Sequence, residues 1–239
     1  MKIDDSPGGA AGCEPFRESF RATVPATYSG PGHGARILGF GLAVIIAACA
    51  SLRAPLTAVE IAVIIPVVIG WNLLEWYGHR ALHRPGRRAL ARALYQRHTL
   101  THHRFFTHES MALRDGRDLK IVFFPAFALP LLTLLALPGL LLLGLLWSAN
   151  AALVALIALV AIYLVFETLH LCAHLPADSR IARLPGIRGM CRHHRRHHDP
   201  RVMMDGNMNF TFPLADWLLG GHARRNSRTD AAGQDARPR

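Results

Sequence analysis

Residues 121 to 166 read IVFFPAFALPLLTLLALPGLLLLGLLWSANAALVALIALVAIYLVF and contain no charged side chain. This uncharged stretch is 46 residues long, whereas a helix needs roughly 20 apolar residues to cross a bilayer. Pro138-Gly139 and the segment from Ser148 to Asn150 offer places for the chain to turn. The stretch therefore predicts two membrane-spanning helices joined as a hairpin.

Two further apolar runs precede this stretch, on either side of Arg53. The second extends from Pro55 to about Trp76, but the first, residues 37–52, has only 16 residues. At ~1.5 Å per residue that first run covers ~24 Å, less than the ~30 Å thickness of the hydrocarbon core. We expect an all-α membrane protein of about four spanning helices in two hairpins, with a shallow or re-entrant first element as the alternative.

The composition of the 239-residue chain agrees with a membrane protein. Hydrophobic residues make up 51%, charged residues only 18%, and the mean hydropathy is +0.21. A soluble domain is about one-quarter charged, so this composition argues against a soluble globule and against a disordered chain. Residues 1–35 have no apolar periodicity and no apolar core of a signal peptide, which predicts a flexible tail before a membrane-embedded domain at residues 36–222. Residues 223–239 are expected to form a second flexible tail.

The distribution of charge predicts the orientation in the membrane. The net charge is +11, with ten Lys and Arg residues between His79 and Lys120 and seven between Arg180 and Arg201. The two opposite turns, around Arg53 and around Gly139, carry one and none. Positively charged loops stay cytoplasmic, so we expect both termini and a histidine-rich helical cap on the cytoplasmic side. The short length of the chain favours a bacterial-type inner membrane. Anionic lipid head groups account for the arginine excess, and no nucleic-acid partner is expected because no binding motif accompanies the charge.

Histidine is the residue type that points to chemistry in this sequence. Ten of the 14 histidines form four clusters with the pattern HxxxH, HxxxHH, HxxxH and HxxHH. Residues three or four apart share one face of a helix, so each cluster can direct two imidazoles toward one point. The first and third clusters lie on the extensions of spans, from Trp71 to His83 and from Tyr163 to His174.

Ten imidazoles exceed the four to six ligands, roughly, that complete one transition-metal shell, and two metal ions match the number better. Imidazole binds zinc, copper, iron and nickel, so the donor type leaves the metal open. A structural zinc site would favour cysteine and would need only about four ligands. An all-nitrogen set of this size suits a redox-active pair that handles dioxygen.

The order of these motifs resembles the fatty acid hydroxylase/sterol desaturase superfamily. The resemblance covers about residues 55 to 220 and includes the closing run NMNFTFPLADWLLG, residues 207–220. It implies a membrane di-iron oxygenase that uses two iron ions and O2 to hydroxylate or desaturate a lipid, such as a fatty acyl chain or a sterol, in lipid biosynthesis. It also implies ten catalytic metal ligands: His79, His83, His98, His102, His103, His170, His174, His194, His197 and His198.

The sequence departs from the pattern of that superfamily at three places. Three residues precede the histidine pair of the second cluster, where two are commoner. Asn209 stands where glycine is usual, and Ala215 replaces a frequent aromatic residue. Two alternative functions stay open: a carotenoid hydroxylase of the same superfamily, and a membrane metal transporter or metal-binding protein. The transporter would be expected to carry histidine or carboxylate ligands deep in its spans, but residues 61–74, 121–140 and 150–166 have none.

Two glutamates lie near the histidine clusters. Glu75 precedes His79 by four residues and Glu167 precedes His170 by three, so each shares a helical face with a histidine. We expect these carboxylates to accept hydrogen bonds from imidazole N–H groups, with pairing to Arg80 or Arg84 as the alternative.

Hydroxylation by O2 requires two electrons from outside the substrate. The sequence has no four-cysteine cluster for an iron–sulfur centre and no GxGxxG motif for a flavin or nicotinamide. We therefore expect a separate electron donor. The arginine-rich face would attract an acidic carrier such as a ferredoxin or a cytochrome, while membrane lipid supplies the substrate.

Overall fold

The computed structural model describes residues 10–221, and every regular element in this part of the chain is a helix. The elements follow in the order α1 (Ala10–Thr23), α2 (Gly30–Ala50), α3 (Ala58–Ala62), α4 (Ile64–Leu82), α5 (Ala89–Tyr95), the π-helix η1 (Gln96–His102), α6 (His103–Phe105), the 3-10 helix η2 (Gly116–Asp118), α7 (Leu119–Val122), α8 (Ala128–Leu146), α9 (Ala149–Ala173), α10 (Pro185–His197) and α11 (Leu214–Leu218).

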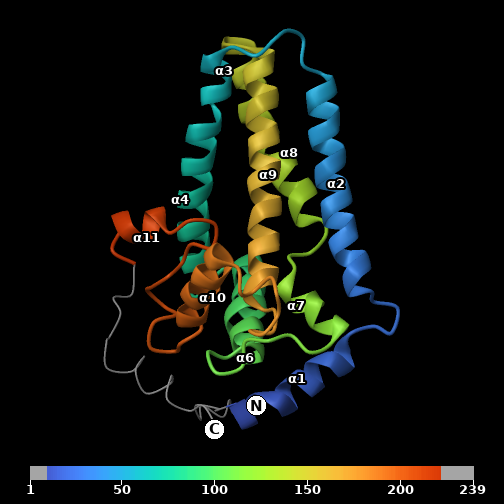
Figure 1. Ribbon diagram of the computed structural model, residues 1–239, viewed down its shortest axis with the longest axis vertical. Coiled ribbons are helices and arrows are strands. Elements are labelled where there is room, and N and C mark those ends of the chain that lie inside the picture. The colour runs from blue at the N-terminus through green and yellow to red at the C-terminus, as the bar shows by residue number, and fades with distance from the viewer. Residues whose placement is uncertain (1–9, 222–239) are drawn as a thin grey trace.

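Four helical segments are long and apolar enough to cross a membrane: Gly30–Ala50, Ala58–Leu82, Ala128–Leu146 and Ala149–Ala173. They stand side by side in Figure 1. Apart from α3, which begins the second span at the opposite end, the shorter helices gather around one end of them. We call this collection of shorter helices and loops the cap. The prediction of an all-α fold with four spans and a histidine-rich region is confirmed.

Helix α9 lies at the centre of the bundle and packs against α2, α4, α8 and α10 (Figure 1). Small side chains such as Ala155 and Ala158 are buried along it. Gly41 of α2 brings that helix close, because a Cβ atom there would lie 2.8 Å from the Leu164 side chain. The leucines of α8 are largely exposed, as expected of a surface that faces lipid tails.

Of the two places predicted for the turn of the second hairpin, the structure uses the later one. Gly139 and Pro138 are inside α8, and the chain turns at Trp147 and Ser148. Leucines on both sides of Pro138 favour one continuous membrane-length helix, and this outweighs the single hydrogen bond that proline removes. The Ser148 side chain instead begins α9 by accepting a hydrogen bond from the Ala151 N–H.

The first apolar run belongs to a helix longer than its uncharged residues suggested. Helix α2 has 21 residues and begins where Ser29 accepts a hydrogen bond from the Gly32 N–H. A helix of this length covers about 32 Å, enough for a full span. The part of α2 that precedes the uncharged run, residues 30–36, is polar. His33 in this part is buried, and its Nε2 atom lies 2.9 Å from the Phe124 carbonyl oxygen.

The predicted flexible N-terminal tail is wrong for residues 10–23, which form α1 and run beneath the cap (Figure 1). Phe16 and Phe20 of this helix pack against a buried cluster that contains Phe105 and Phe106. Apolar side chains four residues apart on one helical face can hold even a short helix against the protein. The predicted C-terminal tail, residues 223–239, and His222 lie outside the described residues.

Candidate metal centre

Nine of the ten predicted histidine ligands meet in two groups at the junction of the spans and the cap. The first group is His79, His83, His98, His103 and His197, and the second is His102, His174, His194 and His198. Within each group the possible ligand atoms all lie within 4.8 Å of one another. The rings are buried, except that of His98, which is half-buried.

Each group draws its histidines from separate elements. The end of α4 supplies His79, and His83 is the residue that caps this helix. The π-helix η1 and α6 provide the second cluster, α9 and its capping residue the third, and α10 with its capping residue the fourth. Helices α4 and α9 run the length of the bundle. Their ends therefore determine the level along the bundle axis at which the second and fourth clusters meet the first and third.

The π-helix explains how the unusual second cluster works. In an α-helix, His103 would lie about 140° around the axis from His98, since each residue turns the chain by about 100°. In η1 the His103 N–H instead bonds to the His98 carbonyl, five residues earlier, which is the π-helical pattern. The extra residue of the HxxxHH motif is thus absorbed in a wider turn. His98 and His103 both reach the first group, with their Nε2 atoms 3.2 Å apart.

The Nε2 atoms of the first group point at one another. The distances are 2.9 Å from His79 to His98, 3.1 Å from His83 to His197 and 3.2 Å from His103 to His197. In His79 and His197 the opposite nitrogen, Nδ1, lies 2.6 Å and 3.0 Å from the carbonyl oxygens of Met208 and Gly206. A carbonyl only accepts hydrogen bonds, so Nδ1 carries the proton in both rings and Nε2 presents a lone pair.

His83 reaches the same state through a hydroxyl group. The Thr99 hydroxyl donates to the Leu82 carbonyl oxygen at 2.8 Å, so it accepts from Nδ1 of His83 at 3.2 Å. At least three lone pairs therefore converge on one point, an arrangement that repels itself unless a cation lies between them. The donor set fits a transition-metal ion.

The second group has the same design. Nδ1 of His174 donates to the Met111 carbonyl oxygen at 3.0 Å, and Nδ1 of His198 donates to that of Phe106. The Nε2 atoms of His174 and His198 each lie 3.0 Å from Nε2 of His194. His102 Nε2 is buried and has no hydrogen-bond partner in the described part of the chain. A second cation would satisfy these nitrogens.

Burial keeps these rings neutral, which metal binding requires. Desolvation lowers the pKa of His83 to about 3. It also lowers the pKa well below the usual value in His98, His102, His103, His174, His194, His197 and His198. A neutral imidazole offers its lone pair to a metal without first losing a proton.

His170, the tenth predicted ligand, lies beside the second group but belongs to neither group. Its ring centroid is 5.0 Å from those of His102 and His174. His170 also lines an apolar cavity, described below.

Glu75 and Glu167 are buried, but they do not accept the predicted hydrogen bonds from the imidazoles, and neither pairs with Arg80 or Arg84. Glu75 accepts hydrogen bonds from the backbone N–H groups of Phe210 and Thr211. Glu167 accepts from the Tyr163 hydroxyl at 2.8 Å and from the Phe124 N–H at 3.2 Å. Glu75 thereby holds the segment that carries the Met208 carbonyl, the hydrogen-bond partner of His79, and Glu167 holds the chain that follows α7 against α9.

Three polar side chains form hydrogen bonds that hold the closing segment, residues 207–220, against α4. These side chains were not predicted from the sequence to lie at the metal centre. The Asp216 carboxylate accepts from the N–H groups of Met208 and Asn209 at 2.9 and 3.0 Å. The Asn209 side chain donates to the Asn72 carbonyl oxygen, and the Asn72 side-chain oxygen accepts from the Ala215 N–H. These bonds fix the Met208 carbonyl that orients His79.

Arg17 is a further residue that the sequence reasoning missed. Its side chain is fully buried and donates to the carbonyl oxygens of Phe105, Ser110 and Ala112. Residues 105–112 include the two carbonyls that hold His198 and His174, so Arg17 positions that loop. The only signal in the sequence was the spacing of Phe16 and Phe20 on one face of α1.

An apolar cavity of about 260 Å³ borders the histidines on the side of the spans. Trp71, Tyr163, Phe166 and Phe210 form much of its wall, and His79, His98 and His170 lie at its inner end. Leu74 and Leu94 also line it and are exposed, so the cavity reaches the outer surface of the molecule.

Comparison with known proteins supports the reading of these motifs. The family model for fatty acid hydroxylase matches residues 64–221, which is more than half of the chain and includes all ten histidines. No curated protein and no solved structure matches the sequence. The match confirms the resemblance in the histidine motifs, and the chain belongs to the fatty acid hydroxylase family, within the fatty acid hydroxylase/sterol desaturase superfamily.

Proposed function

We propose that this protein is an O2-dependent membrane oxygenase that holds two iron ions and hydroxylates or desaturates a lipid. The observation that carries the proposal is the apolar cavity, which leads from the outer surface of the bundle to His79, His98 and His170. A lipid chain that enters from the bilayer would meet the metal centre at the end of this path.

The two histidine groups suit two metal ions of one kind. Five and four imidazoles gather in them, with no cysteine or carboxylate in either group. Such nitrogen donors bind iron, zinc, copper or nickel, and the family membership favours a redox metal for oxygen chemistry. Bound iron would supply the activation of O2 that attack on an unactivated C–H bond requires.

The residues of the chain would position the substrate and exclude water. The aromatic wall of the cavity would hold one methylene group of the lipid near the histidines, and proximity of this kind contributes much of an enzyme's rate. The carbonyls of Met208, Gly206, Met111 and Phe106 hold the rings so that Nε2 faces inward.

The electrons would come from a separate protein. Hydroxylation consumes the substrate, O2, two electrons and two protons and yields the alcohol and water. We place the cap and both termini in the cytoplasm of a bacterial-type cell, on the grounds of the positive-inside rule, where an acidic ferredoxin or cytochrome could reach the arginine-rich surface.

The substrate class can be tested by extracting lipids from cells with and without the protein and analysing them by mass spectrometry. A lipid that gains one oxygen atom or loses two hydrogens only in cells with the protein would identify the substrate.

His197→Ala should remove this product and lower the metal content below about two ions per chain. His108→Ala, at a half-buried histidine outside both groups, should change neither. Full activity and full metal content in the His197→Ala protein would refute the proposed centre.

A further inference from the structure

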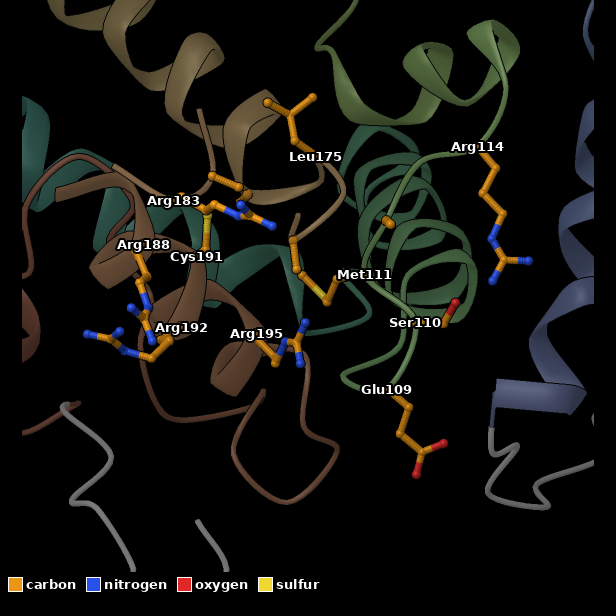
Figure 2. Close-up of a pocket in the computed structure, with 14 residues that line it drawn as sticks. Glu109, Ser110, Met111, Arg114, Leu175, Arg183, Arg188, Cys191, Arg192 and Arg195 are labelled. Atoms are coloured by element: carbon orange, nitrogen blue, oxygen red, sulfur yellow. The ribbon is translucent and has the colours of Figure 1, made fainter. Parts of the chain in front are cut away.

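A second, larger cavity lies in the cap, on the other side of α10 from the metal centre. Its volume is about 710 Å³. Figure 2 shows Arg188, Arg192 and Arg195 projecting from α10, with Arg114 across the cavity on another part of the chain. Arg183 completes a set of five arginines, while Glu109 is the only acidic residue among those that line the cavity.

Four of these arginines have no carboxylate partner in the part of the chain that the structure describes. Arg114 pairs with Glu14 at 3.0 Å. Arg183, Arg188, Arg192 and Arg195 are exposed, and none of the four has a carboxylate partner among residues 10–221. Four guanidinium groups around one hollow repel one another, and an anion between them would relieve this repulsion.

The spacing along α10 separates two functions on one helix. Arg188, Arg192 and Arg195 follow at intervals of four and three residues and so share one face. His194 and His197 are buried on the face toward the metal groups. The arginine face therefore cannot be explained by the metal centre.

The lining of the cavity indicates the chemical class of its ligand. The charge of four free guanidinium groups is more than a single carboxylate would neutralise, whereas arginine binds phosphate oxygens in a bidentate manner. Met111, Leu175 and Ala182 give the same cavity an apolar wall. We propose that this cavity binds an organic phosphate, either a soluble one or the head group of an anionic lipid.

The proposal does not depend on the identity of the oxidised lipid. It does place the ligand next to the metal centre, because Met111 lines the cavity and its carbonyl oxygen accepts the hydrogen bond from His174.

Pyrophosphate is a suitable probe, with the full-length, metal-loaded protein in neutral detergent and titration calorimetry at fixed ionic strength. Arg188→Gln/Arg192→Gln should bind it at least ten-fold more weakly than the wild type. Arg87→Gln/Arg88→Gln removes the same charge from exposed positions away from the cavity and should bind as the wild type does. Unchanged metal content in both variants shows that the fold is intact.

Nanodiscs distinguish the two sources of phosphate. If pyrophosphate binds in phosphatidylcholine discs but not in discs that contain phosphatidic acid, the natural ligand is a lipid head group. If it binds equally in both, the ligand is soluble. Absence of pyrophosphate binding in the wild type, or equal weakening in the two double variants, would overturn the proposal and leave the arginines as a contact surface for an acidic protein.

Discussion

Arg17, a buried arginine of α1, supports the loop that orients two histidines of the second group. Arg17 lies outside the part of the chain that matches the family, yet it bonds to three carbonyls of the loop that orients His174 and His198. Arg17→Ala would leave these carbonyls without their charged donor. We expect unfolding to become easier by about 3 kcal/mol, because unpaired buried polar groups carry a penalty of this order.

The same variant should lose metal from the second group in preference to the first, whose carbonyl partners lie elsewhere. Thermal unfolding and elemental analysis of the purified protein would measure both effects, with Arg87→Ala as the exposed control. Normal metal content in a destabilised Arg17→Ala protein would show that Arg17 supports only the fold.

At the level of single residues, the sequence indicated which histidines gather but not what orients them. Nine histidines could be found from their spacing, because imidazole is rare and chemically distinctive. The carbonyl oxygens of Met208 and Met111 could not, since every residue has a carbonyl and only the folded chain decides which one meets a ring.

At the level of the elements, the π-helix η1 leads to a prediction about the spacing of the second histidine cluster. Deleting Leu100, an exposed residue of η1, would convert HxxxHH to HxxHH. An α-helical turn then keeps all three histidines on one face, so we expect the metal content to persist. Inserting one alanine after Thr101 should instead direct histidines away from the first group and lower the metal content. Elemental analysis of the two proteins measures the difference, and metal loss on the deletion would contradict this account of η1.

The lengths of the elements were harder to predict than their existence. Apolar runs located the four spans, but the boundaries of α2 and α8 depend on a serine cap and on a tolerated proline. Helix α1 was not predicted because its stability comes from contacts with residues about 90 positions away in the sequence, such as the Arg17 bonds to Phe105 and Ser110.

For the molecule as a whole, the charge distribution predicts the direction of insertion. With the four native cysteines replaced by serine, cysteine in place of Arg87 or Asp178, at the cap end, should react with a membrane-impermeant maleimide only from the cytoplasmic side. Cysteine in place of Leu56, in the loop between α2 and α3, should react only from the opposite side. Labelling of Arg87→Cys and Asp178→Cys from opposite sides would be incompatible with one shared metal centre.

A second expectation at this scale concerns the source of electrons. Purified protein with lipid and O2 should stay inactive until a reduced ferredoxin or cytochrome is added, because hydroxylation needs two external electrons. Product formation is the measurement. Sustained turnover without any reductant would contradict the proposed reaction.

The order of the histidines along the chain has a consequence for biosynthesis. Each group contains a histidine of the first half of the chain and at least one from the segment His194–His198. Neither group is complete until α10 has been synthesised and has folded back against α9, after the last span has entered the membrane. A ribosome-bound chain that lacks α10 therefore lacks at least one histidine of each group, and we expect metal uptake to be completed only after membrane insertion.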